Sequence, residues 1–102
     1  MSQVAVEREV ETDIDIPTPG KYKVIIKNDN STPMDFVIAL LMTIFKHSQE
    51  QATAIMLEIH NEGAGVAGVY SYEVAEQKGI EGTLLARQHG WPLQIIVEQE
   101  WH

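Results

Sequence analysis

Residues 22–37 read Tyr22-Lys-Val-Ile-Ile-Lys-Asn-Asp-Asn-Ser-Thr-Pro-Met-Asp-Phe-Val37, and this segment decides the fold. In its first part apolar and charged side chains alternate, which predicts a half-buried strand over residues 21–27. The run of Asn, Asp, Ser and Pro that follows is typical of a turn. We predict that Thr32 caps the next helix, that Pro33 lies in its first turn and that Asp35 stabilises its N-terminus.

The next two segments have the periodicity of amphipathic helices. The first predicted helix ends at His47-Ser48, and its apolar stripe consists of Val37, Leu40, Leu41, Ile44 and Phe45. The second predicted helix begins at Ser48, which can form a capping box with Gln51. Its apolar stripe consists of Ala52, Ile55, Met56 and Ile59.

The C-terminal part predicts a glycine-rich turn over residues 63–68, a short strand at Val69-Tyr70, a third helix and a last strand. We expect Ser71 to cap the third helix, whose apolar positions are Val74, Ala75, Leu84 and Leu85. Gly79 and Gly82 each weaken this helix by about 1 kcal/mol relative to alanine, so tertiary packing must support it. Alternation over residues 93–98 predicts the last strand.

These elements follow the order β-α-α-β-α-β, which predicts a single small α+β domain. We expect a three-stranded antiparallel sheet that is covered on one face by three helices. The first twenty residues differ, because five acidic side chains oppose Arg8 alone and the segment ends in Pro17, Pro19 and Gly20. We predict a flexible acidic arm over residues 1–20, which is neither a secretory signal nor a transit peptide, and a core domain over residues 21–102. An extra edge strand remains the alternative, because Val4, Val6 and Val10 occupy even positions.

Composition excludes several classes of function. The chain has 102 residues, a formal net charge of -8 and no cysteine. A nucleic-acid binder needs a basic face, and a thiol nucleophile or disulfide framework needs cysteine. No apolar run approaches the roughly 18 residues that a membrane-spanning helix requires. We therefore expect no nucleic-acid partner and no membrane insertion.

No motif for catalysis stands out either. Residues 63–68 spell G-x-G-x-x-G, but the dinucleotide fingerprint needs a strand before it and a helix after it, whereas here a helix precedes and a strand follows. The four histidines lack the spacing of a zinc site, and no G-x-S-x-G segment occurs. We predict that the protein is not an enzyme and has no cofactor or metal.

A recognition site is the remaining hypothesis. Asn28 and Asp29 offer polar groups in the first loop, and Met56 and His60 share one face of the second helix. If the first two helices pack antiparallel, an apolar pocket forms below these polar groups, with walls made by Met34, Val37, Met56 and Ile59. The alternative is that these four residues are ordinary core and that His60 is a surface histidine.

The segment Tyr22–Val37 resembles the signature of the ClpS family, the adaptors that deliver N-degron substrates to the ClpA or ClpC unfoldase of the Clp protease. The similarity continues through residues 52–60, residues 68–78 and Pro92-Leu93, so it covers almost the whole predicted core. It implies the same β-α-α-β-α-β order. The ligand it implies is a protein N-terminus that begins with Leu, Phe, Tyr or Trp.

The resemblance also implies roles for single residues. Those that would hold the α-amino group are Asn28, Asp29, Asn30 and His60, the last as a neutral imidazole. Those that would form the side-chain pocket are Thr32, Pro33, Met34, Val37, Met56, Ile59 and Leu93. Met34 matches the family position that disfavours β-branched side chains. Asn30 departs from the family, which usually has Asp there, so one negative charge is lost at the amine site.

A second surface is implied for the unfoldase. Glu73 and Lys78 match positions through which the family docks on the unfoldase N-terminal domain, and the acidic arm resembles the extension that the unfoldase engages. The resemblance further implies a cytoplasmic monomer. An alternative function is a regulator that binds the unfoldase N-terminal domain and alters its choice of substrate without using the pocket.

Overall fold

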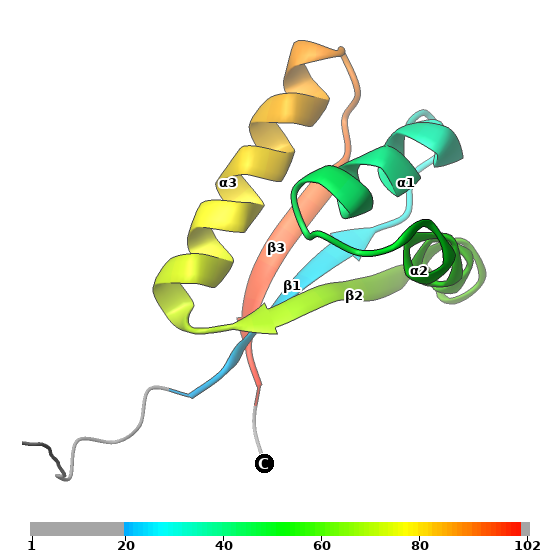
Figure 1. The fold of residues 1–102 in the computed structure, drawn as a ribbon. Coiled ribbons are helices and arrows are strands. Elements are labelled where there is room, and N and C mark those ends of the chain that lie inside the picture. Colours follow the sequence, from blue (N-terminus) through cyan, green and yellow to red (C-terminus); the bar gives the residue numbers. More distant parts are fainter. Residues whose placement is uncertain (1–19, 101–102) are drawn as a thin grey trace, which may run out of the picture.

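The computed structural model describes residues 20–100, so the predicted arm lies outside the described residues apart from Gly20. The elements of this range are β1 (Tyr22–Lys27), α1 (Met34–Thr43), α2 (Gln49–Glu62), β2 (Ala64–Tyr70), α3 (Tyr72–Gln88) and β3 (Gln94–Gln99). Their order confirms the predicted β-α-α-β-α-β arrangement (Figure 1).

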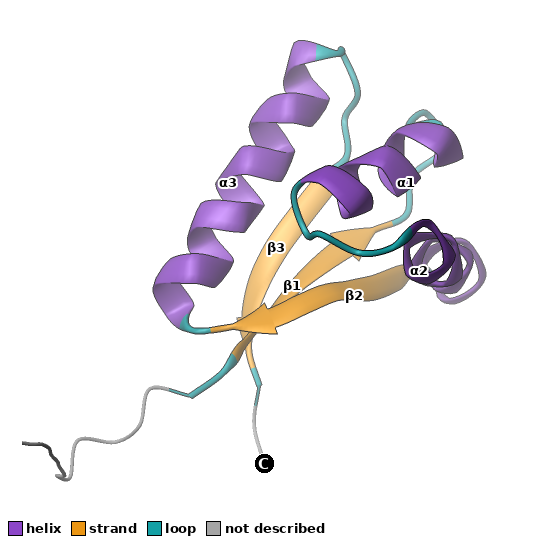
Figure 2. Cartoon of the chain, viewed as in Figure 1, coloured by secondary structure: helices purple, strands orange, loops and turns teal. Residues whose placement is uncertain are grey.

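The three strands form an antiparallel sheet in the order β2-β1-β3, with β1 at the centre. Val24 and Ile26 alternate along β1 with more exposed side chains and are fully buried. They belong to one core cluster with residues of all three helices, such as Leu40, Ile59 and Ala75. Helix α1 packs on α2, while α2 and α3 pack on the sheet, so the helices form the second layer of the fold (Figure 2).

Helix α1 begins one residue later than predicted. Its N-cap is Pro33, whose backbone is extended and whose carbonyl accepts hydrogen bonds from Phe36 N at 3.1 Å and Val37 N at 3.2 Å. The predicted cap, Thr32, instead donates its hydroxyl to Asp29 Oδ2 at 2.8 Å. A residue before proline favours extended backbone, and the Asp29 turn uses the hydroxyl that a cap would need.

Helix α1 also ends earlier than predicted. Its last residue is Thr43, and Lys46 adopts a left-handed backbone with φ of 62°, which redirects the chain before His47. The predicted capping box of α2 is confirmed, because Gln51 N donates to Ser48 Oγ at 3.1 Å and Ser48 N donates to Gln51 Oε1 at 3.2 Å.

The glycine-rich segment is a strand and not the predicted turn. Only Gly63 has a turn conformation, with φ of 89° at the C-terminus of α2, and β2 begins at the next residue. A side chain at Gly65 would place its Cβ 2.8 Å from Ile59 Cγ1. The missing side chain therefore lets α2 approach β2 closely.

The predicted apolar face of helix α3 is confirmed in part. Ala75 is buried and Leu85 packs against the core, as predicted, but Val74 and Leu84 are 43% and 57% exposed. The other buried positions of the helix are small residues, Gly79, Gly82 and Ala86. A Cβ at Gly82 would lie 2.6 Å from Ile95 Cδ1, so the helix sits close to β3. Ser71 precedes α3 as predicted, but its side chain makes no capping hydrogen bond.

Candidate functional site

A cavity of about 250 Å³ opens where the β1–α1 loop, α1, α2 and the segment before β3 meet. It collects the residues expected to form a ligand site except Pro33, and it adds Lys27. The lining consists of Lys27, Asn28, Asp29, Asn30, Thr32, Met34, Val37, Met56, Ile59, His60 and Leu93. Residues from four parts of the chain thus converge as the pocket hypothesis requires.

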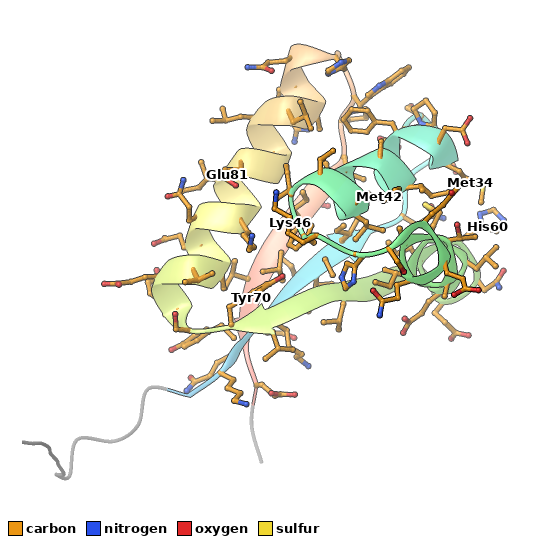
Figure 3. All side chains as sticks on the ribbon, viewed as in Figure 1. Met34, Met42, Lys46, His60, Tyr70 and Glu81 are labelled. Carbon is orange, nitrogen blue, oxygen red and sulfur yellow. The ribbon has the colours of Figure 1, made fainter. Side chains whose placement is uncertain are left out.

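The interior of this cavity is apolar. Val37 comes from α1, Met56 and Ile59 come from α2, and Leu93 comes from the segment before β3, and all four are buried. Met34 stands at the first position of α1 and is 41% exposed. In Figure 3 Met34 and His60 lie on the same side of the molecule, at the start of α1 and on α2. The arrangement can enclose one apolar side chain below polar groups.

The polar rim is organised by Asp29. Its Oδ1 accepts hydrogen bonds from Ser31 N and Thr32 N, both at 2.7 Å, and its Oδ2 accepts the Thr32 hydroxyl. Burial alone would raise the pKa of the Asp29 carboxyl, but these hydrogen bonds and the positive charge of Arg87 hold that pKa below its ordinary value. Asp29 therefore fixes the loop and supplies a negative charge to the rim.

The rest of the rim is exposed and able to meet a ligand. Asn28, Asn30 and His60 are all exposed, and Asn28 N donates to Gly63 O at 3.0 Å. This bond fixes the rim loop to the C-terminal end of α2, the helix that carries His60. The side chains of Asn28, Asn30 and His60 can accept hydrogen bonds from a cationic donor.

Lys27 is the lining residue that the sequence did not single out. It is the last residue of β1 and is exposed, so its alternation in the strand identified it only as solvent-facing. At the rim the positive charge of Lys27 repels a cationic ligand, and solvent weakens this repulsion because it screens charges on the surface.

The two residues expected at the unfoldase surface are not among the residues that line the cavity. Glu73 is exposed in the first turn of α3. Lys78 Nζ donates to Ile44 O at 2.8 Å and lies 5.5 Å from the centre of the Tyr70 ring. The Lys78 ammonium group therefore ties α3 to the end of α1, and its docking role stays a prediction.

Between Gly20 and Glu100 no three His, Asp or Glu side chains are placed to hold a metal ion together. Over the same described range, no helix combines the length and apolar character needed to cross a bilayer.

The chain is similar in sequence to known proteins. The family model for the ATP-dependent Clp protease adaptor protein ClpS matches residues 17–96. The ClpS adapter of Hyphomonas neptunium is 49% identical over 90 residues, which cover 88% of this chain and 76% of that protein. The ClpS adapter of Helicobacter hepaticus is 42% identical over 99 residues, which cover 97% of this chain and 98% of that protein.

A solved structure is also similar, that of Agrobacterium tumefaciens ClpS2 bound to L-phenylalaninamide. Its TM-score is 0.78 at 35% identity, and the match covers 80% of this chain and 99% of that one. The resemblance carried by residues 22–37 is thus confirmed over most of the sequence and in three dimensions. This chain belongs to the ClpS family of Clp protease adaptors.

Proposed function

We propose that this protein is an adaptor that binds proteins with a free N-terminal Leu, Phe, Tyr or Trp and delivers them to the ClpA or ClpC unfoldase for degradation by ClpP. The observation that carries the proposal is the cavity, whose apolar interior lies below a rim of hydrogen-bond acceptors. The ClpS2 neighbour binds L-phenylalaninamide, which combines a free α-amino group with an aromatic side chain.

The rim suits the α-amino group of such a ligand. This group is largely cationic at neutral pH, so it donates hydrogen bonds and attracts negative charge. Asn28, Asn30 and neutral His60 offer lone pairs, and ionised Asp29 supplies the charge. An N-acetylated chain has neither the charge nor the three donors, so the rim discriminates against it.

The interior suits the first side chain. Transfer of a Leu or Phe side chain from water into an apolar site contributes roughly 1.5–3 kcal/mol. Met34 stands exposed at the mouth of the cavity, where it would crowd a branch at the Cβ of Ile or Val. We therefore propose that Met34 restricts the ligands to unbranched Cβ atoms.

The proposed activity is binding, and no bond is broken. It needs no catalytic residue or cofactor, and we place it in the cytoplasm with the chain acting as a monomer. A regulator that works without the pocket is less well supported, because it leaves the preformed cavity without a use and gives no reason for the likeness to a ligand-bound ClpS2 structure.

A degradation assay tests delivery. A fluorescent protein that begins with Phe is incubated with unfoldase, ClpP and ATP, with or without this chain. We expect rapid degradation only with the chain, and inhibition by excess L-phenylalaninamide. Equal rates with and without the chain would refute delivery, and a rate that L-phenylalaninamide does not change would favour the regulator.

A further inference from the structure

The short connection between α3 and β3 forms one wall of the cavity. Leu93 lies in this connection, is 1% exposed and lines the cavity. The start of the connection is fixed by backbone hydrogen bonds from Gly90 N to Arg87 O at 3.0 Å and from Trp91 N to Ala86 O at 2.9 Å. Pro92 follows and has no N–H group to donate. The position of Leu93 therefore depends on other contacts.

Arg87 provides such a contact from the last turn of α3. Its Nη1 donates to Trp91 O at 2.8 Å and to Leu93 O at 2.9 Å, the carbonyls on either side of Pro92. A guanidinium nitrogen holds its two N–H groups in fixed directions in one plane, so it defines the positions of both acceptors. The side chain thus orients the backbone that carries Leu93.

The same guanidinium also acts on the rim loop. Its charge is one of the causes that hold the pKa of Asp29 below the ordinary value. Arg87 therefore affects the charge of the rim as well as the wall, although it is not among the residues that line the cavity.

We propose that Arg87 is a positioning residue of the ligand site, which keeps Leu93 in place against the first side chain of the bound N-terminus without contacting it. This inference rests on the proposed function. Neither the motifs nor the resemblance indicated a role for this residue.

The direction in which peptide affinity changes when Arg87 is replaced distinguishes a positioning role from a purely electrostatic one. A positive charge near the site repels a cationic ligand, so its removal alone would strengthen binding. Loss of the two hydrogen bonds lets the Leu93 wall move, which weakens the binding of bulky side chains. Arg87→Gln removes the charge, and its shorter side chain withdraws the N–H donors from the two carbonyls, whereas Arg87→Lys keeps the charge. Lys46→Gln is the matched control, because it removes an exposed cation at a residue outside the cavity lining.

The experiment measures fluorescence anisotropy with labelled peptides that differ only in a first residue of Phe or Ala. We expect Arg87→Gln to weaken binding of the Phe peptide by about tenfold, the size of one lost charged hydrogen bond. Binding of the Ala peptide should change much less, so the Phe-to-Ala affinity ratio falls. Arg87→Lys should fall between wild type and Arg87→Gln, and Lys46→Gln should change the ratio by less than about twofold.

If Arg87 had a merely structural role, Arg87→Gln would reduce the folded fraction and weaken the binding of both peptides equally. The Phe-to-Ala affinity ratio would then be unchanged. An unchanged or increased ratio therefore overturns the inference. If circular dichroism shows that Arg87→Gln does not fold, the Phe-to-Ala affinity ratio of Arg87→Lys tests the inference instead, and an unchanged or increased ratio overturns it. Failure of the proposed function is a separate result, because wild type would then not prefer the free Phe peptide to its N-acetylated form.

Discussion

At the scale of single residues, the charge of the rim is set by few groups. Asp29 is ionised but already accepts three hydrogen bonds within its own loop. Asn30 is exposed at the rim and neutral, and Lys27 adds a positive charge. A cationic N-terminus therefore meets one negative charge that is partly satisfied and one positive charge. This balance of charges predicts that the site binds a cationic N-terminus less tightly than it would with a second negative charge at the rim.

Asn30→Asp should tighten binding of a Phe- or Leu-starting peptide, because a charge-assisted hydrogen bond is roughly twice as strong as a neutral one. Anisotropy titrations at low and high salt measure the gain, which should shrink as salt screens the new charge. Gln49→Glu is the control, since it adds the same charge at the exposed start of α2. Unchanged or weaker binding by Asn30→Asp would contradict this view of the rim.

Asp29→Asn should lower the melting temperature at pH 7, because the carboxylate is stabilised in the folded protein by its loop hydrogen bonds. Since the folded-state pKa lies below the ordinary value, the stabilisation is complete above about pH 4 and is lost as pH falls through the folded-state pKa. Thermal melts from pH 7 to pH 2 should show the two proteins converging. A constant difference at all pH values would show that the charge of Asp29 is not the cause.

At the scale of elements, the site depends on how closely α2 approaches β2. Gly65 in β2 faces Ile59 in α2, and Ile59 lines the cavity. The glycine pattern that resembles a dinucleotide motif thus serves helix–sheet packing. Lys78 makes a second connection between elements, from α3 to the end of α1.

Gly65→Ala should push Ile59 from its place, since the new Cβ would lie 2.8 Å from Ile59 Cγ1. Overpacking of this kind costs about 1–3 kcal/mol of stability, and it should also weaken binding of a Phe-starting peptide. Urea unfolding and anisotropy measure the two effects. Gly63→Ala tests backbone strain without a steric clash, because Gly63 has φ of 89° and no atom outside its chain neighbours lies within 4 Å of a Cβ built there. Normal stability and affinity in Gly65→Ala would contradict the packing role.

Lys78→Met should lower the melting temperature, because it removes the bond to Ile44 O and the contact of the ammonium group with Tyr70. Glu73→Gln, on the exposed first turn of the same helix, should lower the melting temperature less, because it removes only the interaction of an exposed charge with the helix N-terminus. If both variants impair delivery but only Lys78→Met melts early, then Glu73 docks directly and Lys78 acts in part through the fold. Equal melting temperatures would show that the Lys78 contacts do not stabilise the protein.

Local patterns predicted the elements that local forces determine. Alternation identified β1, and the capping box of Ser48 and Gln51 located the start of α2. The first part of β2 and the burial of Gly79 and Gly82 in α3 were not predicted, because both depend on glycines that allow close contact with distant residues. The cavity was predicted through spacing and resemblance, whereas the place of Lys27 in its lining and the hydrogen bond from Arg87 to Leu93 O were recognised only in the structure.

At the scale of the whole molecule, we expect ligand binding and delivery to use different parts of the chain. The cavity is built entirely from residues 27–93, whereas the acidic arm lies outside the described residues. A protein whose arm is removed should therefore keep its ligand site. The arm is expected to act in the step that transfers a bound protein to the unfoldase.

Deletion of the arm, residues 1–20, should preserve the affinity for a Phe-starting peptide and abolish degradation of a Phe-starting protein. Anisotropy and the degradation assay measure the two quantities on the same preparation. Replacement of the arm by a neutral Gly/Ser segment of equal length shows whether transfer depends on the sequence of the arm or only on its length. Full degradation with the truncated adaptor would refute a role of the arm in transfer.

The most direct measurement compares binding of a labelled Phe-starting peptide with that of its N-acetylated twin to the wild-type protein. The two ligands share every apolar atom of the first side chain and differ in the α-amino group. We predict saturable binding of the free peptide, competed by L-phenylalaninamide, and no measurable binding of the acetylated one. Equal binding of both peptides, or of neither, would contradict a cavity that recognises a free N-terminus.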